Sequence, residues 1–288
     1  MVLSISIVNW QTRDDLRRCL ASLPGGAPQT PLEVFVVDNA STDGSAEMVA
    51  AEFPHVRLLR NPENRGFAHA NNVALRQCAG EYLLLLNPDT RVHAGALDAL
   101  VAGMEAHPEA GIGGAKLLNP DGSVQYSCRR FPTVATGLFR NGALGRLFPG
   151  NARVRDYLMT DFDHASVAAV DWVSGAALCI RRAVLEQIGL LDESFFMYCE
   201  DVDWCYRAGR AGWKVLYFPD AVITHVIGRS SDQAVERMVR AHHHSMGLFF
   251  EKHYAPAMPA LLRWAPRLGI WLRLQWVLRE KRRGRRTP

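Results

Sequence analysis

The stretch Leu83-Leu84-Leu85-Leu86-Asn87-Pro88-Asp89-Thr90 joins four consecutive leucines directly to polar residues. Continuous aliphatic residues are typical of a parallel strand that helices cover on both faces, because neither face then reaches water. Pro88 has no backbone N–H to donate, so it ends the hydrogen-bonded ladder. We therefore expect residues 82–86 to form a central parallel strand whose carboxyl end carries Asn87 and Asp89.

Strands and helices are expected to alternate before this strand. The expected strands are 4–8, 32–37 and 56–59, and the expected helices are 13–23, 45–53 and 67–78. Strands separated by helices of about ten residues predict βαβ units. The predicted fold class is α/β, with a Rossmann-like, mostly parallel central sheet flanked by helices.

Polar side chains follow three of these strands. Asn9 follows the first, Asp38 and Asn39 follow the second, and Asn87 and Asp89 follow the fourth. In parallel sheets of this kind, ligands bind at the carboxyl ends of the strands. The three strand ends together predict one ligand site at that edge.

The second half of the chain is less regular. We expect strands over 110–118, 123–131, 170–180 and 214–218, and helices over 182–188 and 200–211. The segment 132–165 is rich in glycine and is expected to be a loop region that faces an acceptor. No convincing linker divides the first 255 residues.

The composition, 48% apolar and 22% charged over 288 residues, is that of an ordinary soluble globular protein. Six cysteines without a CxxC pair indicate reduced thiols in a cytosolic protein. No basic segment precedes an apolar run at the start, so a signal peptide is not expected. No apolar stretch reaches the roughly 18–20 residues of a membrane-spanning helix.

The C-terminal tail is strongly basic. The chain carries a net charge of +4, and residues 263–288 hold eight Arg and one Lys against one Glu, so the tail carries +8 and the remainder −4. At helical spacing, one broad apolar face is shared by Trp264, Leu268, Trp271, Leu272 and Leu278, with Pro266 interrupting it. Such a face beside cations suits an anionic membrane surface; a helix packed on the body is the equal alternative. Nucleic acid is not an expected partner, because the body is acidic and lacks a binding motif.

Asp89 and His225 are candidate ligands for a divalent cation. Mg²⁺ or Mn²⁺ takes few protein carboxylates and completes its shell with diphosphate oxygens and water, and an imidazole ligand favours Mn²⁺. The alternatives are a helix-capping carboxylate for Asp89 and a buried core histidine for His225. Arg229 and Ser230, which follow His225, suit a phosphate and favour the functional interpretation.

Glu200, Asp201 and Asp203 crowd the start of an expected helix. Compensation of the helix dipole explains acids in a first turn. Three carboxylates within four residues exceed what that requires, and a base that accepts a hydroxyl proton must be ionised. The apolar neighbours 195–198 suit a sugar site. We interpret this cluster as a candidate catalytic group.

Asp38, Asn39, Asn64 and Arg65 are candidates for contacts to a nucleobase or ribose. The motifs GxGxxG, GxxxxGK[ST] and GxSxG are absent from the expected strand–helix junctions. Their absence disfavours dinucleotide-binding, P-loop and hydrolase functions.

A set of motifs along residues 3–250 resembles the inverting GT-A glycosyltransferases of family 2, and most closely their rhamnosyltransferase-like branch. The motifs are, in order, SIVNW, VDNASTDGS, NRGFAHANN, LLLLNPDT, WVSGAALCIRR, FFMYCEDVDWCYR and THVIGRS. The resemblance implies a GT-A domain over 1–255, with a nucleotide-binding half (1–118) and an acceptor-binding, catalytic half (119–255). The tail, 256–288, is expected to be a helical extension.

The resemblance also implies roles for individual residues. Asp201, paired with Glu200, would be the general base of a single displacement with inversion, and Asp89 and His225 would hold Mn²⁺ or Mg²⁺. The implied nucleotide-binding residues are Asn9, Asp38, Asn39, Asn64, Arg65, Asn71, Asn87 and Arg229. Asn87 departs from the family's DxD pattern, in which an aspartate occupies this position, so metal affinity is expected to be weaker.

The implied reaction transfers a sugar from a dTDP- or UDP-sugar, with L-rhamnose from dTDP-rhamnose as the leading case. The acceptor would be a glycan or a lipid-linked sugar in cell-surface polysaccharide synthesis. The expected location is the cytoplasm, with peripheral attachment to the inner face of the cell membrane as a further option. The alternative is a nucleotide-sugar-binding scaffold without turnover, although such a protein should have lost Asp89 or the Glu200-Asp201 pair. A nucleotidyltransferase is disfavoured, because the first strand is not followed by a glycine-rich basic loop.

Overall fold

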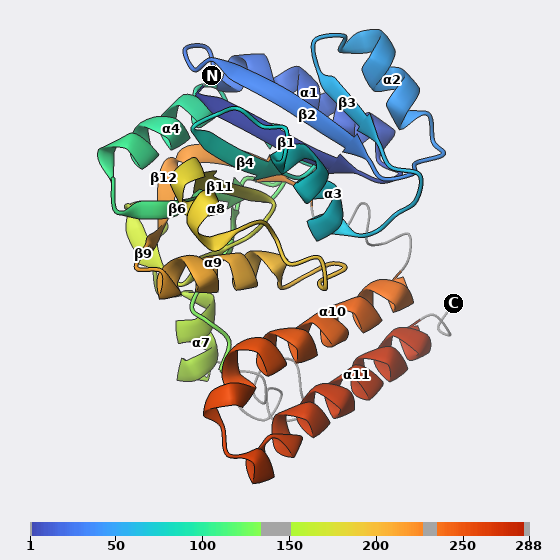
Figure 1. Cartoon of the computed structure of the whole chain (residues 1–288), viewed down its shortest axis with the longest axis vertical. Coiled ribbons are helices and arrows are strands. Elements are labelled where there is room, and N and C mark those ends of the chain that lie inside the picture. The colour runs from blue at the N-terminus through green and yellow to red at the C-terminus, as the bar shows by residue number, and fades with distance from the viewer. Residues whose placement is uncertain (1, 134–150, 227–234, 285–288) are drawn as a thin grey trace.

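The structure, a computed structural model, describes residues 2–133, 151–226 and 235–284 (Figure 1). One sheet dominates it, in the order β3-β2-β1-β4-β11-β6-β12-β5. Its strands are β1 (Leu3–Asn9), β2 (Leu32–Asp38), β3 (Arg57–Arg60), β4 (Tyr82–Leu86), β5 (Thr90–Val92), β6 (Ala110–Leu118), β11 (Ala177–Arg181) and β12 (Lys214–His225).

The sheet is mostly parallel, as predicted. Strand β1 lies between β2 and β4 and runs parallel to both, and β12 runs parallel to β6. Strand β11 enters antiparallel between β4 and β6, and β5 pairs antiparallel with β12. The predicted central position of β4 is confirmed.

Helices cover both faces of this sheet, which explains the four leucines. One face carries α1 (Arg13–Gly26), α2 (Ser45–Glu52) and α4 (Ala96–Ala106), and the other carries α3 (Phe67–Leu75), α8 (Arg182–Ile188) and α9 (Glu200–Arg210). Leu84 and Leu86 pack in the first core, whereas Leu83 and Leu85 pack in the second. Each leucine is at most 1% exposed, so a polar residue at any of these positions would be buried without water.

Four expectations for the second half are wrong. The expected strand 123–131 is split into β7 (Val124–Gln125) and β8 (Cys128–Arg129), because β7 pairs with β6 and β8 with β10 (Trp172–Val173) of a separate ribbon. The expected strand 170–180 is divided among β9 (Ala168–Val170), β10 and β11 for the same reason.

Strand β12 extends to residue 225 instead of ending at 218. Pro219 has no N–H to donate to the neighbouring strand, and the register of β12 on β6 shifts between Phe218 and Val222. Regular pairing resumes at Val222. The expected loop 132–165 contains helix α7 (Ala152–Leu158), and its residues 134–150 lie outside the described chain. The extension of β12 matters for function, because it carries His225 to the site.

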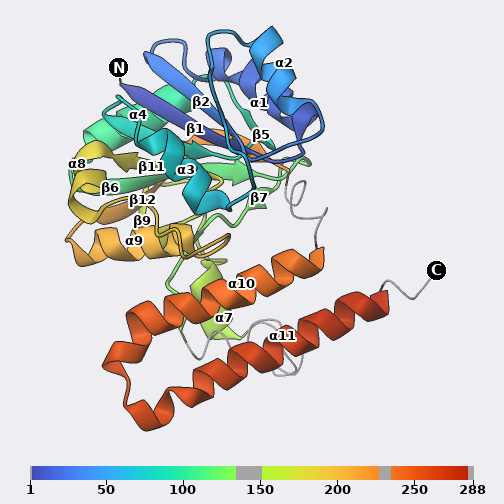
Figure 2. The same cartoon turned by 45° about the vertical axis from the view of Figure 1, so that its right-hand side comes forward.

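The expected extension from residue 256 is helical, as predicted, but it pairs with a helix that lies inside the expected domain 1–255. Together they form an antiparallel C-terminal hairpin below the body (Figures 1 and 2). It comprises α10 (Val235–Phe249), a π-helical turn η2 (Phe250–Tyr254), the 3₁₀ turns η3 (Ala255–Ala257) and η4 (Ala260–Leu262), and α11 (Trp264–Gly284). Pro266 does not interrupt α11, because in the first turn its missing N–H has no intrahelical partner to lose. Leu278 is buried, so it does not belong to the exposed apolar face that includes Trp264, Leu268, Trp271 and Leu272.

The six cysteines are unpaired thiols, as expected, and five of them are buried. Among the described residues, no helix combines the length and the apolar character that crossing a bilayer requires.

Candidate active site

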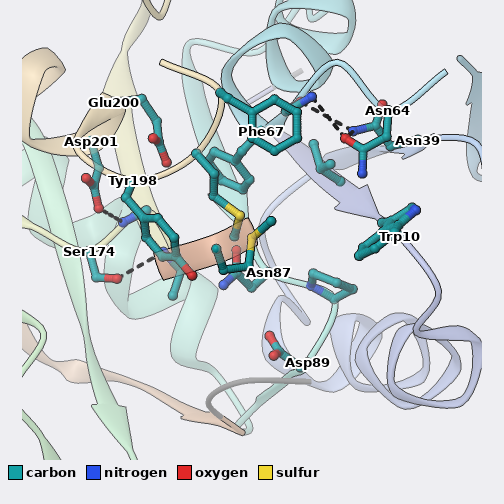
Figure 3. Close-up of a pocket in the computed structure, with 18 of the residues that line it drawn as sticks. Trp10, Asn39, Asn64, Phe67, Asn87, Asp89, Ser174, Tyr198, Glu200 and Asp201 are labelled. Carbon is teal, nitrogen blue, oxygen red and sulfur yellow. Dashed lines mark hydrogen bonds between the residues drawn. The ribbon is translucent and has the colours of Figure 1, made fainter. Parts of the chain in front are cut away.

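A pocket of about 250 Å³ lies where β1, β2 and β4 end and where α9 begins. Figure 3 shows Trp10, Asn39 and Asn64 on one side and Glu200 and Asp201 on the other. Thus the pocket extends from the predicted nucleotide-binding amides to the predicted catalytic carboxyls. Its further lining residues include Val8, Gly66, Phe67, Asn87, Pro88, Asp89, Ser174, Gly175, Phe196, Met197, Tyr198, His225, Arg237 and Met238.

Asn9 and Asp38 sit beneath the pocket at the ends of neighbouring strands. The parallel register pairs them, and Asn9 Nδ2 donates to Asp38 Oδ1 at 3.2 Å. Asp38 Oδ2 accepts from the backbone N–H of Ser41, and Asn9 Oδ1 accepts from Thr12 Oγ1. Both side chains are almost fully buried, so in this structure they shape the loop after β2, and their contact with a nucleotide stays a prediction.

Asn39 and Asn64 form the amide wall of the pocket. Asn39 Nδ2 donates to Asn64 Oδ1 at 2.9 Å, and the same oxygen accepts from the backbone N–H of Gly66. Gly66 has φ +95°, and a Cβ there would lie 2.1 Å from the carbonyl oxygen of Phe196. A side chain at this position would therefore push the amide wall away from the loop that carries Phe196.

Two other predicted nucleotide-binding residues do not line the pocket. Arg65 is exposed on the loop before α3. Asn71 is fully buried, where it accepts from Ser6 Oγ at 2.8 Å and donates to the carbonyl of Phe67. Asn71 thus ties α3 to β1, and a direct role for it stays a prediction. Arg229 lies outside the described residues.

Asp89 and His225 are brought together by the antiparallel pairing of β5 with β12. The register places His225 opposite Thr90, and the His225 Nε2–Asp89 Oδ1 distance is 3.3 Å. The side-chain nitrogen of Gln125 donates to Asn119 Oδ1 and to the His225 carbonyl. The side-chain oxygen of Gln125 therefore lies toward His225 Nδ1, at 2.7 Å. Nδ1 therefore carries a proton, and in the neutral ring Nε2 has a lone pair.

These residues fit a divalent cation. Asp89 Oδ1 is buried and accepts no hydrogen bond within the described chain, and Nε2 of His225 lies beside it on the pocket wall. An orphaned carboxylate oxygen next to an imidazole lone pair is electrostatically costly without a cation or a proton. Because no cluster of three or more ligating side chains occurs in the described residues, diphosphate oxygens and water would have to complete the shell. Asn87 Nδ2 lies 3.3 Å from His225 Nε2, so this amide faces the same ring nitrogen.

Asp201 has the environment of a general base. Its Oδ2 accepts from the backbone N–H of Gly175 at 2.9 Å, and its Oδ1 accepts from the N–H of Val202 at 2.8 Å. Burial raises the pKa of Asp201, and these two donors, with the guanidinium of Arg129, oppose the rise. A carboxylate whose pKa is raised accepts a proton more readily than an ordinary aspartate does.

Glu200, its neighbour, is adapted to hold a proton. Burial and the adjacent Asp201 charge raise its pKa well above the ordinary range. Its Oε2 is buried, and no described group bonds to it. The two backbone N–H donors on Asp201 favour the negative charge on that carboxyl of the pair.

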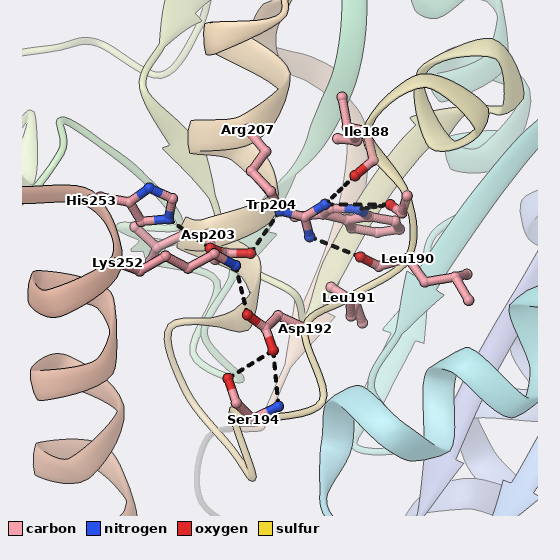
Figure 4. A network of polar contacts seen from close by, with 12 residues as sticks. Ile188, Leu190, Leu191, Asp192, Ser194, Asp203, Trp204, Arg207, Lys252 and His253 are labelled. Carbon is pink, nitrogen blue, oxygen red and sulfur yellow. Dashed lines mark hydrogen bonds and ion pairs between the residues drawn. The ribbon is translucent and has the colours of Figure 1, made fainter. Parts of the chain in front are cut away.

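Asp203, the third carboxylate of the cluster, does not line the pocket. Figure 4 shows it beside Lys252 and His253. It is fully buried and accepts from Arg207 Nε at 2.8 Å, Lys252 Nζ at 2.8 Å and His253 Nε2 at 2.6 Å. Lys252 also reaches Asp192 Oδ2 at 2.6 Å. Asp203 thus joins α9 to the π-helical turn η2, and it is a structural ion-pair residue.

Sequence reasoning missed Arg237, which lines the pocket from α10. Its guanidinium lies 4.8 Å from the ring centre of Phe196. No motif marks this helix, so only folding of the C-terminal hairpin brings Arg237 to the site. Tyr198 and Cys199, before α9, both have positive φ, at 70° and 66°. Two consecutive non-glycine residues in this region cost about 1–3 kcal/mol each and are typical of functional sites.

A sequence profile of the family described as "Glycosyltransferase like family 2" matches residues 2–242. The chain belongs to glycosyltransferase family 2. The expected enzyme class, a glycosyltransferase, is thereby confirmed.

Several known proteins are similar to this family 2 chain. An N-acetylglucosaminyl-diphospho-decaprenol L-rhamnosyltransferase of Mycobacterium tuberculosis is 34% identical, over 99% of this chain and 96% of its own. The rhamnosyltransferase WbbL of Escherichia coli is 25% identical, over 71% and 72%. In fold, the mannosyltransferase PcManGT of Pyrobaculum calidifontis, solved with GDP-Man and Mn²⁺, matches with a TM-score of 0.57 at 18% identity, over 94% of this chain and 69% of its own. The resemblance to the rhamnosyltransferase-like branch and the GT-A fold are thus confirmed.

Proposed function

We propose that this enzyme transfers L-rhamnose from dTDP-rhamnose, with inversion, to a sugar that is linked to a lipid through a diphosphate. The carrying observation is the pocket itself, in which Asp201 lies across from the Asn39–Asn64 amide wall (Figure 3) and which Asp89 and His225 also line. The similarity to the mycobacterial rhamnosyltransferase over nearly the whole of both chains supports this choice of sugar and acceptor. A scaffold without turnover would have no reason to keep a buried carboxyl pair at raised pKa.

The reaction is a single displacement at the anomeric carbon. An acceptor hydroxyl gives its proton to a carboxylate oxygen of Asp201 while the hydroxyl oxygen forms a bond to the anomeric carbon. The bond from that carbon to the diphosphate oxygen breaks, and the nucleoside diphosphate leaves with its electron pair. Asp89 and His225 would hold Mn²⁺ or Mg²⁺, which when bound stabilises the negative charge of the diphosphate.

The basic, apolar face of α11 supports a place at the cytoplasmic surface of the membrane. Trp264, Trp271 and Leu272 are each more than half exposed, and Arg267 and Arg279 lie on the same helix. Aromatic side chains beside cations favour the headgroup region of an anionic bilayer. Flotation with liposomes of phosphatidylglycerol should bring the wild type to the lipid fraction and leave a Trp264→Ser, Trp271→Ser variant behind. Equal flotation of both proteins would refute this placement.

A donor and acceptor panel tests the function. The wild type is given dTDP-rhamnose, UDP-GlcNAc or GDP-mannose with a lipid-linked GlcNAc diphosphate, with and without Mn²⁺. We expect product only from dTDP-rhamnose, and donor affinity that rises with Mn²⁺ in wild type but not in Asp89→Ala. Transfer from another donor would replace the proposed sugar, and an Asp89→Ala variant with full Mn²⁺-dependent affinity would remove Asp89 from the metal site.

A further inference from the structure

A second pocket, of about 230 Å³, lies between α9 and the C-terminal hairpin. Its walls come from the start of α9, the end of α10, the π-helical turn η2 and the first half of α11. The lining side chains that matter here are Cys199, Val202, Met246, Phe249, Ile270 and Arg273. Apart from Arg273, Thr133 and the phenol of Tyr254, the side chains that line this pocket are apolar or thiol groups. A ligand that enters this space must itself be largely apolar.

The apolar pocket and the catalytic pocket share one turn of the chain. Tyr198, Glu200 and Asp201 line the catalytic pocket, and Cys199 and Val202 line the apolar one. The turn is held from the hairpin side, because Ser245 Oγ of α10 donates to the carbonyl of Met197 at 2.9 Å. The two pockets are therefore back to back, separated by the residues that carry the base.

The rim of the apolar pocket continues into the exposed apolar face of α11. Ala265 lines the pocket and is exposed, and its neighbours Trp264 and Leu268 are exposed as well. An apolar path thus leads from the hairpin surface toward the turn that bears Asp201. A contiguous patch of exposed apolar side chains is typical of a surface that binds a partner or a membrane.

A cation marks the inner part of this path. Arg273 lines the pocket, donates to His243 Nε2 and Met246 Sδ, and is near enough to Cys199 to oppose the rise that burial causes in the pKa of that thiol. A molecule that reaches around this turn, with a hydroxyl at Asp201 and a hydrocarbon chain in the apolar pocket, would pass an anionic linker near this guanidinium. A lipid diphosphate has that order of groups.

We propose that this pocket binds the first part of the hydrocarbon chain of the lipid-linked acceptor. The inference rests on the proposed function and deepens it, because it assigns the acceptor's lipid to a protein pocket rather than to the membrane alone. Recognition then comes from apolar burial, which increases with each methylene until the pocket is full.

Gly269 offers a direct way to fill the pocket. It lines the pocket on α11, and a Cβ added there meets no atom within 4 Å. Leucine at this position would occupy the space and also raise helix propensity. Gly247 on α10 provides the matched control, because a Cβ there is equally unobstructed and the residue does not line the pocket.

The experiment uses the full chain without liposomes or detergent. The probes are butyl, hexyl and octyl esters of GlcNAc diphosphate, each below its aggregation concentration, with dTDP-rhamnose as donor. For the wild type and Gly247→Leu, acceptor KM should fall about 4-fold for each added methylene until the pocket is filled. For Gly269→Leu, and for Ile270→Asn as a second variant, KM should depend little on chain length.

Each outcome has a distinct meaning. A wild-type KM that is independent of chain length, or a Gly269→Leu variant that keeps the full dependence, would overturn the lipid assignment and leave a peptide segment or a second protein as the occupant. Absence of transfer to every ester would instead refute the proposed function. Melting temperatures of both leucine variants near that of the wild type would show that the effect does not come from unfolding.

Discussion

Two faces of helix α9 hold carboxylates only two residues apart, yet the pKa of one is raised and the pKa of the other is lowered. On the pocket face, burial raises the pKa of Asp201, and only backbone N–H groups and a more distant guanidinium oppose it. On the opposite face, burial alone would raise the pKa of Asp203, but His253, Lys252 and Arg207 outweigh it and lower the pKa. Backbone donors leave a carboxylate able to take a proton, whereas close cations remove its basicity.

The largest expected effect comes from removing the charge on the pocket face. Asp201→Asn keeps the shape and the hydrogen-bonding sites but cannot accept a proton, so kcat should fall about 10³-fold. Donor affinity, measured by calorimetry, should stay within about 2-fold because the donor groups lie on the other wall. Glu105→Gln, an exposed substitution on α4, serves as the control. Wild-type kcat in Asp201→Asn would show that the base is another group.

Removing the charge on the opposite face should mainly affect folding. Asp203→Asn leaves Arg207 and Lys252 without their buried carboxylate and should lower the free energy of unfolding by about 3 kcal/mol, measured in urea. Because the pKa of Asp203 is lowered, its contribution is fully present above its ordinary value of 3.8 and is lost as the pH falls through the lowered pKa. The loss of stability in the variant should shrink over that same range. Arg17→Gln, which breaks an exposed ion pair with Glu52, should change stability far less. An Asp203→Asn protein as stable as Arg17→Gln would contradict the structural role.

The smallest effect is expected at Glu200. Its raised pKa means that the folded state binds more protons than the unfolded state above the ordinary value of 4.5, so stability falls as the pH rises through that range. Glu200→Gln imitates the protonated form and removes this loss. The difference in melting temperature should therefore grow in favour of the variant as the pH rises above the ordinary value of 4.5. A difference independent of pH would mean that Glu200 is ionised in the folded protein. The kcat should fall less than about 10-fold, since the base is Asp201.

These faces could not be told apart from the residues alone. The sequence places Glu200, Asp201 and Asp203 in one helical turn, and both dipole compensation and catalysis were consistent with that pattern. The structure separates them through partners that are distant in the chain: Gly175 for Asp201, and Lys252 and His253 for Asp203. Such partners carry no local signal, because they meet only after the sheet and the hairpin have formed.

The sequence by itself determined the sheet and its ligand edge. Continuous leucines followed by Asn87, Pro88 and Asp89 require a strand buried on both faces that stops at a polar edge, and strand periodicity is a local property. Only the tertiary structure decided which polar groups face the pocket. It placed Asn71 in the core and brought Arg237 to the site from α10, and it left a second, apolar pocket behind the catalytic turn. The physical reason is that pairing and packing depend on contacts across long separations in the chain, whereas strand and helix patterns depend on near neighbours.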